Sequence, residues 1–161
     1  MKKECSYEEA RLKAEAYCSL SEHCKQEVLT KLQQWGAPAE DWETIVGHLE
    51  KEGFVDEQRY AKSYVRDKYR FNQWGRIKIN QALRLKQVSS SCIAVAMDEI
   101  DEEEYLSILA SLLKKKRRMV KAANDYERNG KLLRFAAGHG YEMDAILLCL
   151  KRMGCDDEYM E

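Results

Sequence analysis

The chain has 161 residues, of which 45% are hydrophobic and 34% charged, and its formal net charge is −1 at pH 7. No stretch approaches the roughly 18 apolar residues of a membrane span, and the start lacks the apolar block of a signal peptide, so we expect a cytoplasmic protein without a membrane partner. A single proline, abundant Lys, Glu, Leu and Ala, and the lack of alternating Val/Ile/Thr runs exclude a sheet and predict an all-α fold.

One pattern recurs three times along the chain, beginning at Val28, Ile79 and Leu132. Each copy reads as an apolar residue, then Leu or Ala four positions later, then Gly or Gln four positions after that, followed by Ala, Val or Tyr. These first positions lie 51 and 53 residues apart. Such a fixed period indicates a tandem repeat.

Each copy is predicted to hold a helix, a tight turn and a second helix, with one more amphipathic helix upstream. The upstream helices are expected at 7–18, 57–71 and 102–121. Ser6 and Asp101, each followed three residues later by Glu, resemble capping boxes. Gly36 and Gly140 suit the left-handed backbone that ends a helix, whereas Gln87 is a weaker stop.

This pattern predicts three tandem three-helix repeats of helix-turn-helix type. We place them at residues 1–54, 55–100 and 101–161. Units of roughly fifty residues bury little core alone, so neighbours should lean on one another in an elongated arrangement.

No motif for catalysis or metal binding is visible. The cysteines and histidines form no CxxC and no metal-ligand set; they are Cys5, Cys18, Cys24, Cys92, Cys149, Cys155, His23, His48 and His139. We expect reduced, structural thiols and no cofactor. A GxxxxGKS loop, GxGxxG, GxSxG and HExxH are also lacking, so we predict no catalytic residues and no enzymatic activity.

The small net charge hides a segregation along the chain. Residues 59–86 hold nine Lys/Arg and one acid, and residues 114–134 hold nine Lys/Arg and two acids. Residues 87–113 hold six acids and no Lys or Arg, and the first 58 residues carry thirteen acids against seven bases. The middle of the chain is therefore basic, with acidic flanks.

On a helical wheel of about 100° per residue, the basic side chains fall on faces of two predicted helices. In 57–71, one face carries Arg59, Lys62, Arg66 and Arg70, and the other carries Tyr60, Ala61, Tyr64, Val65 and Phe71. In 102–121, Lys114, Arg118 and Lys121 lie opposite Tyr105, Leu109, Leu112 and Leu113. Solvation explains one such face, but two faces of the same sign favour a polyanionic partner, and nucleic acid is the natural one.

Two aromatic residues accompany the first basic segment. Tyr69 and Trp74 are candidates for stacking on unpaired bases. Ordinary core packing is the alternative for both side chains.

The segment that joins the first two copies has a distinctive sequence. Gly53-Phe54-Val55-Asp56-Glu57-Gln58-Arg59-Tyr60-Ala61 resembles the G-[FY]-[LV]-[DN]-[DE]-x-R-[FY]-A signature of the RecX family, bacterial regulators of the RecA recombinase. Further family motifs are matched in order by 22–32, 75–83 and 131–141, and the resemblance spans about residues 8–153. Cys24 stands where the family usually has Ser, which is a better helix cap.

The resemblance implies a non-enzymatic modulator that lies in the groove of the RecA–DNA filament and inhibits ATP hydrolysis and strand exchange. We expect a monomer whose partner is this filament, with weak, electrostatic binding to single- and double-stranded DNA alone. The residues assigned to the RecA and DNA contact are Arg59, Lys62, Arg66, Arg70, Arg84, Lys114, Arg118 and Lys121.

The sequence also allows three other functions. A transcription regulator would insert one helix-turn-helix, best placed around Gln87, into the major groove, although no heptad or long apolar face marks the dimer interface that such proteins use. A structural helical scaffold would leave both basic faces solvated. An enzyme with an unrecognised site is the remaining alternative.

Overall fold

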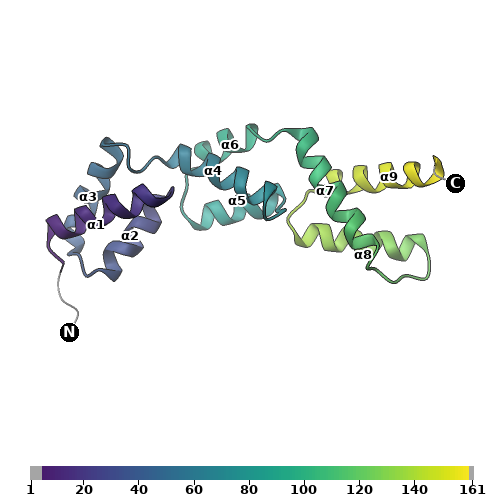
Figure 1. The fold of residues 1–161 in the computed structure, drawn as a ribbon, viewed down its shortest axis with the longest axis horizontal. Coiled ribbons are helices and arrows are strands. Elements are labelled where there is room, and N and C mark those ends of the chain that lie inside the picture. The colour runs from purple at the N-terminus through teal and green to yellow at the C-terminus, as the bar shows by residue number, and fades with distance from the viewer. Residues whose placement is uncertain (1–4, 160–161) are drawn as a thin grey trace. The chain divides into compact units, whose positions relative to one another are not determined.

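The structure is a computed structural model that describes the backbone of residues 5–159 and the side chains of residues 5–154. The described residues form nine helices and no strand, which confirms the predicted all-α fold (Figure 1). The helices are α1 (Tyr7–Leu20), α2 (Lys25–Gln34), α3 (Ala39–Lys51), α4 (Glu57–Arg70), α5 (Arg76–Leu85), α6 (Ser90–Asp98), α7 (Glu102–Arg117), α8 (Asp125–Gly138) and α9 (Met143–Tyr159).

The recurring sequence pattern corresponds to a recurring helix end. The third residue of the pattern takes a positive φ in each copy: 79° at Gly36, 61° at Gln87 and 91° at Gly140. The residue that follows donates its N–H to the carbonyl five positions earlier: Ala37 to Leu32 at 3.0 Å, Val88 to Leu83 at 3.1 Å and Tyr141 to Ala136 at 3.2 Å. This is the Schellman motif, and it ends α2, α5 and α8 in the same way even where Gln replaces Gly.

The apolar positions of the pattern are core positions. The six side chains are fully buried: Val28, Leu32, Ile79, Leu83, Leu132 and Ala136. Burial of one large aliphatic side chain contributes about 1.5–3 kcal/mol. The repeat therefore places equivalent anchors in three successive helix pairs, as the sequence predicts.

The described chain divides into two compact units. The first runs to Ser63 and includes Leu83–Ala96, and the second comprises Tyr64–Ala82 and the residues from Met97 onward. In the first unit α1, α2 and α3 pack on one another, and in the second α7, α8 and α9 do. Because α4 and α5 each contribute to both units, the repeat boundaries set from the sequence stay a prediction.

Two helix starts in the first unit show how the chain caps its backbone. The Ser6 hydroxyl accepts a hydrogen bond from the Glu9 N–H at 3.2 Å, which is the serine half of the predicted capping box. At the start of α2, the Glu27 carboxylate accepts the Cys24 N–H at 3.2 Å. Glu27 thus satisfies the backbone at a position where the cysteine replaces a better cap.

Within the first unit, carboxylates join α2 and the loop before it to α4 and to the residue just after α5, and we call this region the first junction. Arg59 Nε lies 2.6 Å from Glu22 Oε1, and Lys86 Nζ lies 3.2 Å from Glu27 Oε2. The Lys25 N–H donates to the Glu57 carboxylate at 2.8 Å. In each of these contacts, at least one side chain is partly exposed to solvent.

Within the second unit, the start of α5 meets the turn between α8 and α9, and we call this region the second junction. The Gly75 N–H donates to the His139 carbonyl at 2.8 Å, and the Ile77 N–H donates to the Gly140 carbonyl at 3.0 Å. A Cβ on Gly75 would lie 2.3 Å from the carbonyl carbon of Gly140. Glycine at position 75 is what lets the two backbones bond directly.

A buried tyrosine completes the second junction. The Tyr105 hydroxyl accepts the Arg76 N–H at 3.0 Å and donates to the Glu142 carboxylate. The Arg76 guanidinium lies 4.1 Å from the Tyr105 ring centroid and bonds Glu142 at 2.9 Å and Glu102 at 2.5 Å. Burial raises the pKa of Tyr105 above its usual value, so the phenol stays protonated and can donate.

Candidate binding surface

Helix α4 separates apolar from basic side chains much as the wheel predicts. It begins where the Asp56 carboxylate accepts the Arg59 N–H at 3.0 Å. Tyr60, Ala61 and Val65 are buried on one side. Phe71, predicted to belong to that side, is 79% exposed. It lies one residue beyond the end of α4, so the helical periodicity no longer fixes its direction.

The basic side chains at the two ends of α4 are ion-paired. Arg59 also donates to the Gly53 carbonyl at 3.1 Å, in addition to its contact with Glu22. Arg70 Nε lies 2.6 Å from Glu104 Oε1, and this hydrogen bond is the main cause that lowers the pKa of the Glu104 carboxyl. Their side chains remain 44% and 43% exposed, so both ion pairs are open to exchange with solvent or a partner.

Arg66, which lies between these ends, differs from both of them. Arg66 is exposed, and no side chain in the described part of the chain pairs with it. Lys62 is half-buried. Arg66 is therefore the cation of α4 that is most available for an external anion.

The other predicted cations lie on α5, α7 and the segment after α7. Arg84 and Lys114 are exposed, and among residues 5–154 no ion-pair partner is found for either side chain. Helix α7 ends at Arg117, not at residue 121 as predicted, and Arg118 is its C-cap. Lys121 is exposed in the loop beyond, where its carbonyl accepts the Lys131 ammonium at 2.7 Å.

The early end of α7 has a physical reason. Its last turn concentrates Lys and Arg, which favour a helix C-terminus. The Met119 N–H then bonds the Lys116 carbonyl at 2.9 Å in a tight turn. Asn124 starts α8 soon after, with its side chain accepting the Glu127 N–H at 2.8 Å. Lys121 therefore lies on no helical face.

Tyr69 does not serve as a stacking platform. It is 3% exposed, and its ring centroid lies 6.4 Å from that of Tyr105 in an edge-to-face arrangement. The sequence left base stacking and core packing open for Tyr69, and core packing is correct. The sequence leaves both interpretations open because a helical wheel contains no information about a second helix that covers Tyr69.

Trp74 lies in a basic cluster that the sequence pattern does not reveal. Its half-buried ring has Lys78 Nζ at 4.5 Å and Lys68 Nζ at 4.7 Å from a ring centroid. The two lysines are on different helices, so no periodicity links them. Cations over an aromatic face are attracted by about 0.5–1 kcal/mol at exposed sites.

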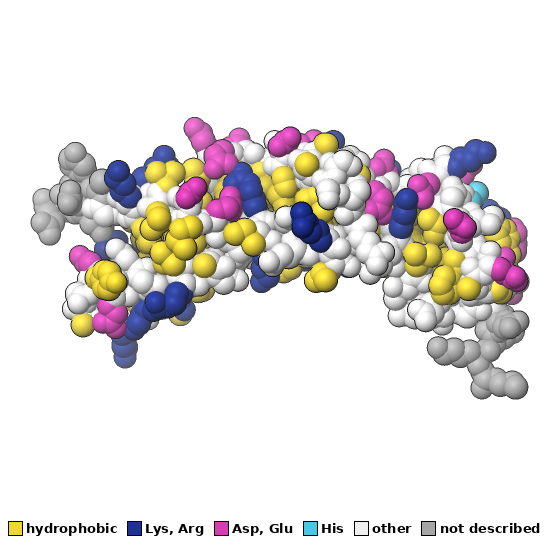
Figure 2. All heavy atoms as spheres, turned by 180° about the vertical axis from the view of Figure 1, so that it is seen from behind, with side chains coloured by type: hydrophobic (Ala, Val, Ile, Leu, Met, Phe, Trp, Pro, Cys, Tyr) yellow, Lys and Arg dark blue, Asp and Glu magenta, His cyan; other side chains and the backbone are white. Residues whose placement is uncertain are grey.

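Acidic side chains pair with some of the assigned cations. Figure 2 shows one face of the protein, on which Asp and Glu side chains lie among those of Lys and Arg. Glu22, in the α1–α2 loop, and Glu104, in the first turn of α7, lie far along the chain from Arg59 and Arg70. The segregation of charge in the sequence therefore overstates the separation of charge in space.

Among the described side chains there is no metal site, and burial keeps the thiol of one cysteine protonated. Among residues 5–154, no three His, Cys, Asp or Glu side chains are arranged to hold a metal ion. Burial raises the pKa of Cys18 to about 11, so its thiol stays protonated at neutral pH. Cys155 lies outside the described side chains. No helix in the described chain is both long and apolar enough to cross a membrane.

Family models match two parts of the chain. Residues 56–97 match the model described as RecX, second three-helix domain. Residues 102–150 match RecX, third three-helix domain. The two matches follow one another in the order that the family models prescribe.

Comparison with known proteins gives relatives of similar length. The regulatory protein RecX of Pseudomonas fluorescens is 32% identical over 138 residues, covering 84% of this chain and 86% of the relative. That of Pelodictyon phaeoclathratiforme is 28% identical over 142 residues, covering 86% and 87%. The crystal structure of RecX from Lactobacillus salivarius shares the fold, with a TM-score of 0.84 at 17% identity over 92% of this chain and 97% of that one. The chain therefore belongs to the RecX family of regulatory proteins.

Proposed function

We propose that the protein is a non-catalytic inhibitor of the RecA recombinase that binds the RecA–DNA filament as a monomer through its exposed basic side chains. Family membership supports a regulatory role. The observation that carries the proposal is a set of exposed cations that no other described side chain neutralises: Arg66, Arg84, Lys114, Arg118 and Lys121.

These cations suit a partner that combines phosphate with acidic protein surface. An exposed Lys or Arg gains most when it replaces condensed counterions on a polyanion. The ion pairs of Arg59 and Arg70 are weak enough, at about 0–1 kcal/mol each, to be exchanged for such a partner. The interspersed Glu side chains would repel bare DNA, so we expect binding to DNA alone to be weak and to fall steeply with salt.

The transcription-regulator alternative receives no support from the helix pair around Gln87. The second helix of that pair, α6, would be the one to enter the major groove. Its sequence, SSCIAVAMD, contains no Lys, Arg, Asn or Gln. The side chains that usually read base edges are lacking there.

The direct test measures ATP hydrolysis by a preformed RecA filament on single-stranded DNA. The full chain should slow hydrolysis in a saturable way. The double change Arg66→Glu with Arg118→Glu should raise the concentration needed for half inhibition by about tenfold or more, because attraction becomes repulsion at two positions. Both residues are exposed, so each change should alter stability by only about 0.5 kcal/mol.

Lys51→Glu is the matched control. Lys51 is an exposed cation at the end of α3, in the acidic first part of the chain, and is not assigned to the surface. The Lys51→Glu variant should inhibit ATP hydrolysis like the unchanged protein. A double variant that is folded and inhibits fully would refute the assigned surface, and an unchanged hydrolysis rate with excess unchanged protein would refute the proposed function itself.

A further inference from the structure

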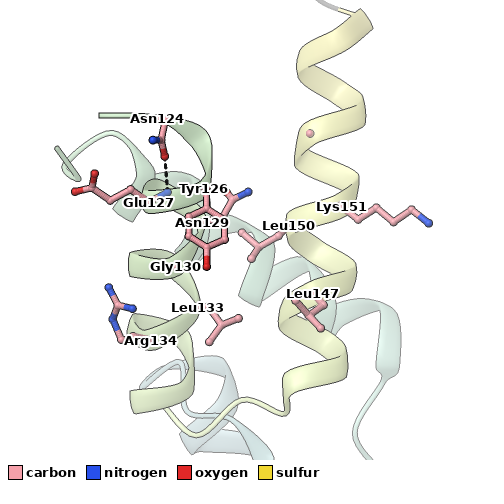
Figure 3. Close-up of a pocket in the computed structure, with 11 residues that line it drawn as sticks. Asn124, Tyr126, Glu127, Asn129, Gly130, Leu133, Arg134, Leu147, Leu150 and Lys151 are labelled. Carbon is pink, nitrogen blue, oxygen red and sulfur yellow. Dashed lines mark hydrogen bonds between the residues drawn. The ribbon is translucent and has the colours of Figure 1, made fainter. Parts of the chain in front are cut away.

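A groove of about 880 Å³ runs between α8 and α9 (Figure 3). Its lining residues come from both helices: Asn124, Tyr126, Glu127, Asn129, Gly130, Leu133, Arg134, Leu147, Leu150, Lys151 and Gly154. α8 and α9 pack on each other, so the groove is a surface feature of one compact unit.

The interior of the groove is apolar and open. In Figure 3, Leu133 extends from α8 toward α9, and Leu150 extends from α9 toward α8. Leu147 is 51% exposed and Tyr126 is 91% exposed. Contiguous exposed apolar side chains at a groove mark a surface that gains stability when a partner covers it, at about 25 cal/mol per Å².

Cations flank this apolar strip on both sides. Figure 3 shows Arg134 extending from α8 away from α9, and Lys151 extending from α9 away from α8. Neither side chain has an ion-pair partner among the described residues. The one carboxylate among the lining residues, Glu127, is occupied, because it accepts the Ala123 N–H at 3.2 Å and pairs with Lys131 at 3.4 Å.

We propose that this groove binds an acidic, amphipathic helix of a protein partner. The apolar face of the helix would cover Leu133, Leu147 and Leu150, and its carboxylates would reach Arg134 on one side and Lys151 on the other. This is the helix-in-groove mode of recognition. Helix α8 has 14 residues, so a parallel partner of about four turns, roughly 21 Å long, fits the groove.

Two other occupants fit less well. Nucleic acid would bring phosphates to the flanks but would leave the aliphatic strip without an apolar counterpart. In a two-fold dimer through this groove, each copy would present the same cations to the other and they would repel. The inference does not rest on the proposed function, because its residues are separate from the basic surface set.

The probe is a fluorescein-labelled, 14-residue peptide with Leu at positions i, i+3, i+4 and i+7 and Glu at most other positions. Fluorescence anisotropy with the full chain should show saturable binding. Leu147→Ser should weaken it by about tenfold, because a central apolar contact is lost. The double change Arg134→Glu with Lys151→Glu should weaken it by about tenfold or more through repulsion.

Matched variants lie elsewhere on the protein. Leu12→Ser alters a leucine of similar exposure, 54%, on α1. Lys115→Glu reverses an exposed cation on α7 that does not line the groove. Both should bind the peptide like the unchanged protein. A peptide of the same composition with its leucines spread around the helix, and one with Lys in place of Glu, should each bind at least about tenfold more weakly.

Several outcomes would overturn the proposal. These are a lack of saturable binding, equal affinity for the Lys-containing peptide, or groove variants that bind like Leu12→Ser and Lys115→Glu. Displacement of the peptide by a single-stranded oligonucleotide at equal concentration would identify a nucleic-acid site instead. A concentration-dependent dimer in sedimentation that Leu147→Ser abolishes would identify a second copy as the occupant.

Discussion

The two junctions differ in the atoms that hold them. At the first junction, half-exposed ion pairs such as Arg59–Glu22 join the α1–α2 loop to α4, and the two side chains are 44% and 33% exposed. At the second junction, the Gly75 and Gly140 backbones meet beside the fully buried Tyr105. Exposed ion pairs contribute about 0–1 kcal/mol each, whereas a buried hydrogen bond left unmade costs about 1–3 kcal/mol. We infer that the first junction yields readily to salt or a partner and that the second is rigid.

This difference bears on the proposed surface. Arg59 belongs both to the first junction and to the assigned set, so an anionic partner that takes Arg59 would release Glu22. Glu22 Oε2 is buried and has no hydrogen-bond partner among the described residues, so the carboxylate is only half satisfied already. Binding at this place would be coupled to the contact between the first helices and α4.

The largest effect is expected from Leu83→Ala, because α5 contributes to both units. Leu83 is fully buried and lies in the first unit, and Ile79, one turn earlier, lies in the second. Truncation of a fully buried leucine leaves a cavity and should cost about 2–5 kcal/mol of unfolding free energy. Urea unfolding followed by far-UV circular dichroism measures it. An unchanged midpoint would place Leu83 outside the core and contradict the repeat alignment.

A smaller effect, confined to the second junction, is expected from Gly75→Ala. The added Cβ would lie 2.3 Å from backbone atoms of Gly140 and Tyr141, which cannot move as a flexible side chain can. Such overpacking should cost about 1–3 kcal/mol. Gly138→Ala is the control, because its Cβ would meet nothing within 4 Å in the last turn of α8. It should stabilise the protein by about 0.5–1 kcal/mol. Equal midpoints for the two variants would disprove the close approach.

Tyr105→Phe tests the polar part of the same junction. It leaves the Arg76 N–H and the Glu142 carboxylate without the hydroxyl, and should cost about 1–3 kcal/mol at neutral pH. The folded-state pKa of Tyr105 is raised, so its neutral form stabilises the fold below the unfolded pKa of about 10, and that stability is lost as pH rises above it. The unchanged protein should therefore lose more unfolding free energy between about pH 9 and 11 than the variant does. If unfolding free energy falls equally with pH in the unchanged protein and in Tyr105→Phe, this role of the Tyr105 hydroxyl is contradicted.

The sequence predicts the repeats well because each is set by local rules. Val28, Ile79 and Leu132 are anchors at helical spacing, and the turns after them need only a residue that tolerates positive φ. At the helix starts, the side chains of Ser6 and Asp101 accept the backbone N–H of the residue three positions later. Information within one helix and its ends is enough for these features.

The surface is harder to predict because distant residues decide it. Tyr69 is covered by Tyr105, which lies on another helix, and no pattern in 57–71 contains that information. Glu104 similarly engages Arg70 across a long stretch of chain. Lys121 leaves the helical face because α7 ends at Arg117, and helix ends are less certain than helix interiors. The α8–α9 groove likewise depends on how two helices pack.

The smallest expected effects are the coupling energies of single ion pairs. Double-mutant cycles compare one ion pair from each junction. At the first junction, Arg59→Ala and Glu22→Ala should show a coupling of about 0.5 kcal/mol that vanishes in 1 M salt, because both side chains are partly exposed and the charges are screened. At the second, Arg76→Ala and Glu142→Ala should show about 1 kcal/mol or more that persists in salt, since the Arg76 guanidinium also packs on the buried Tyr105 ring and bonds a second carboxylate. Urea titrations at low and high salt supply both cycles. Equal coupling energies with equal salt dependence would contradict the inference that the first junction yields readily to salt and the second is rigid.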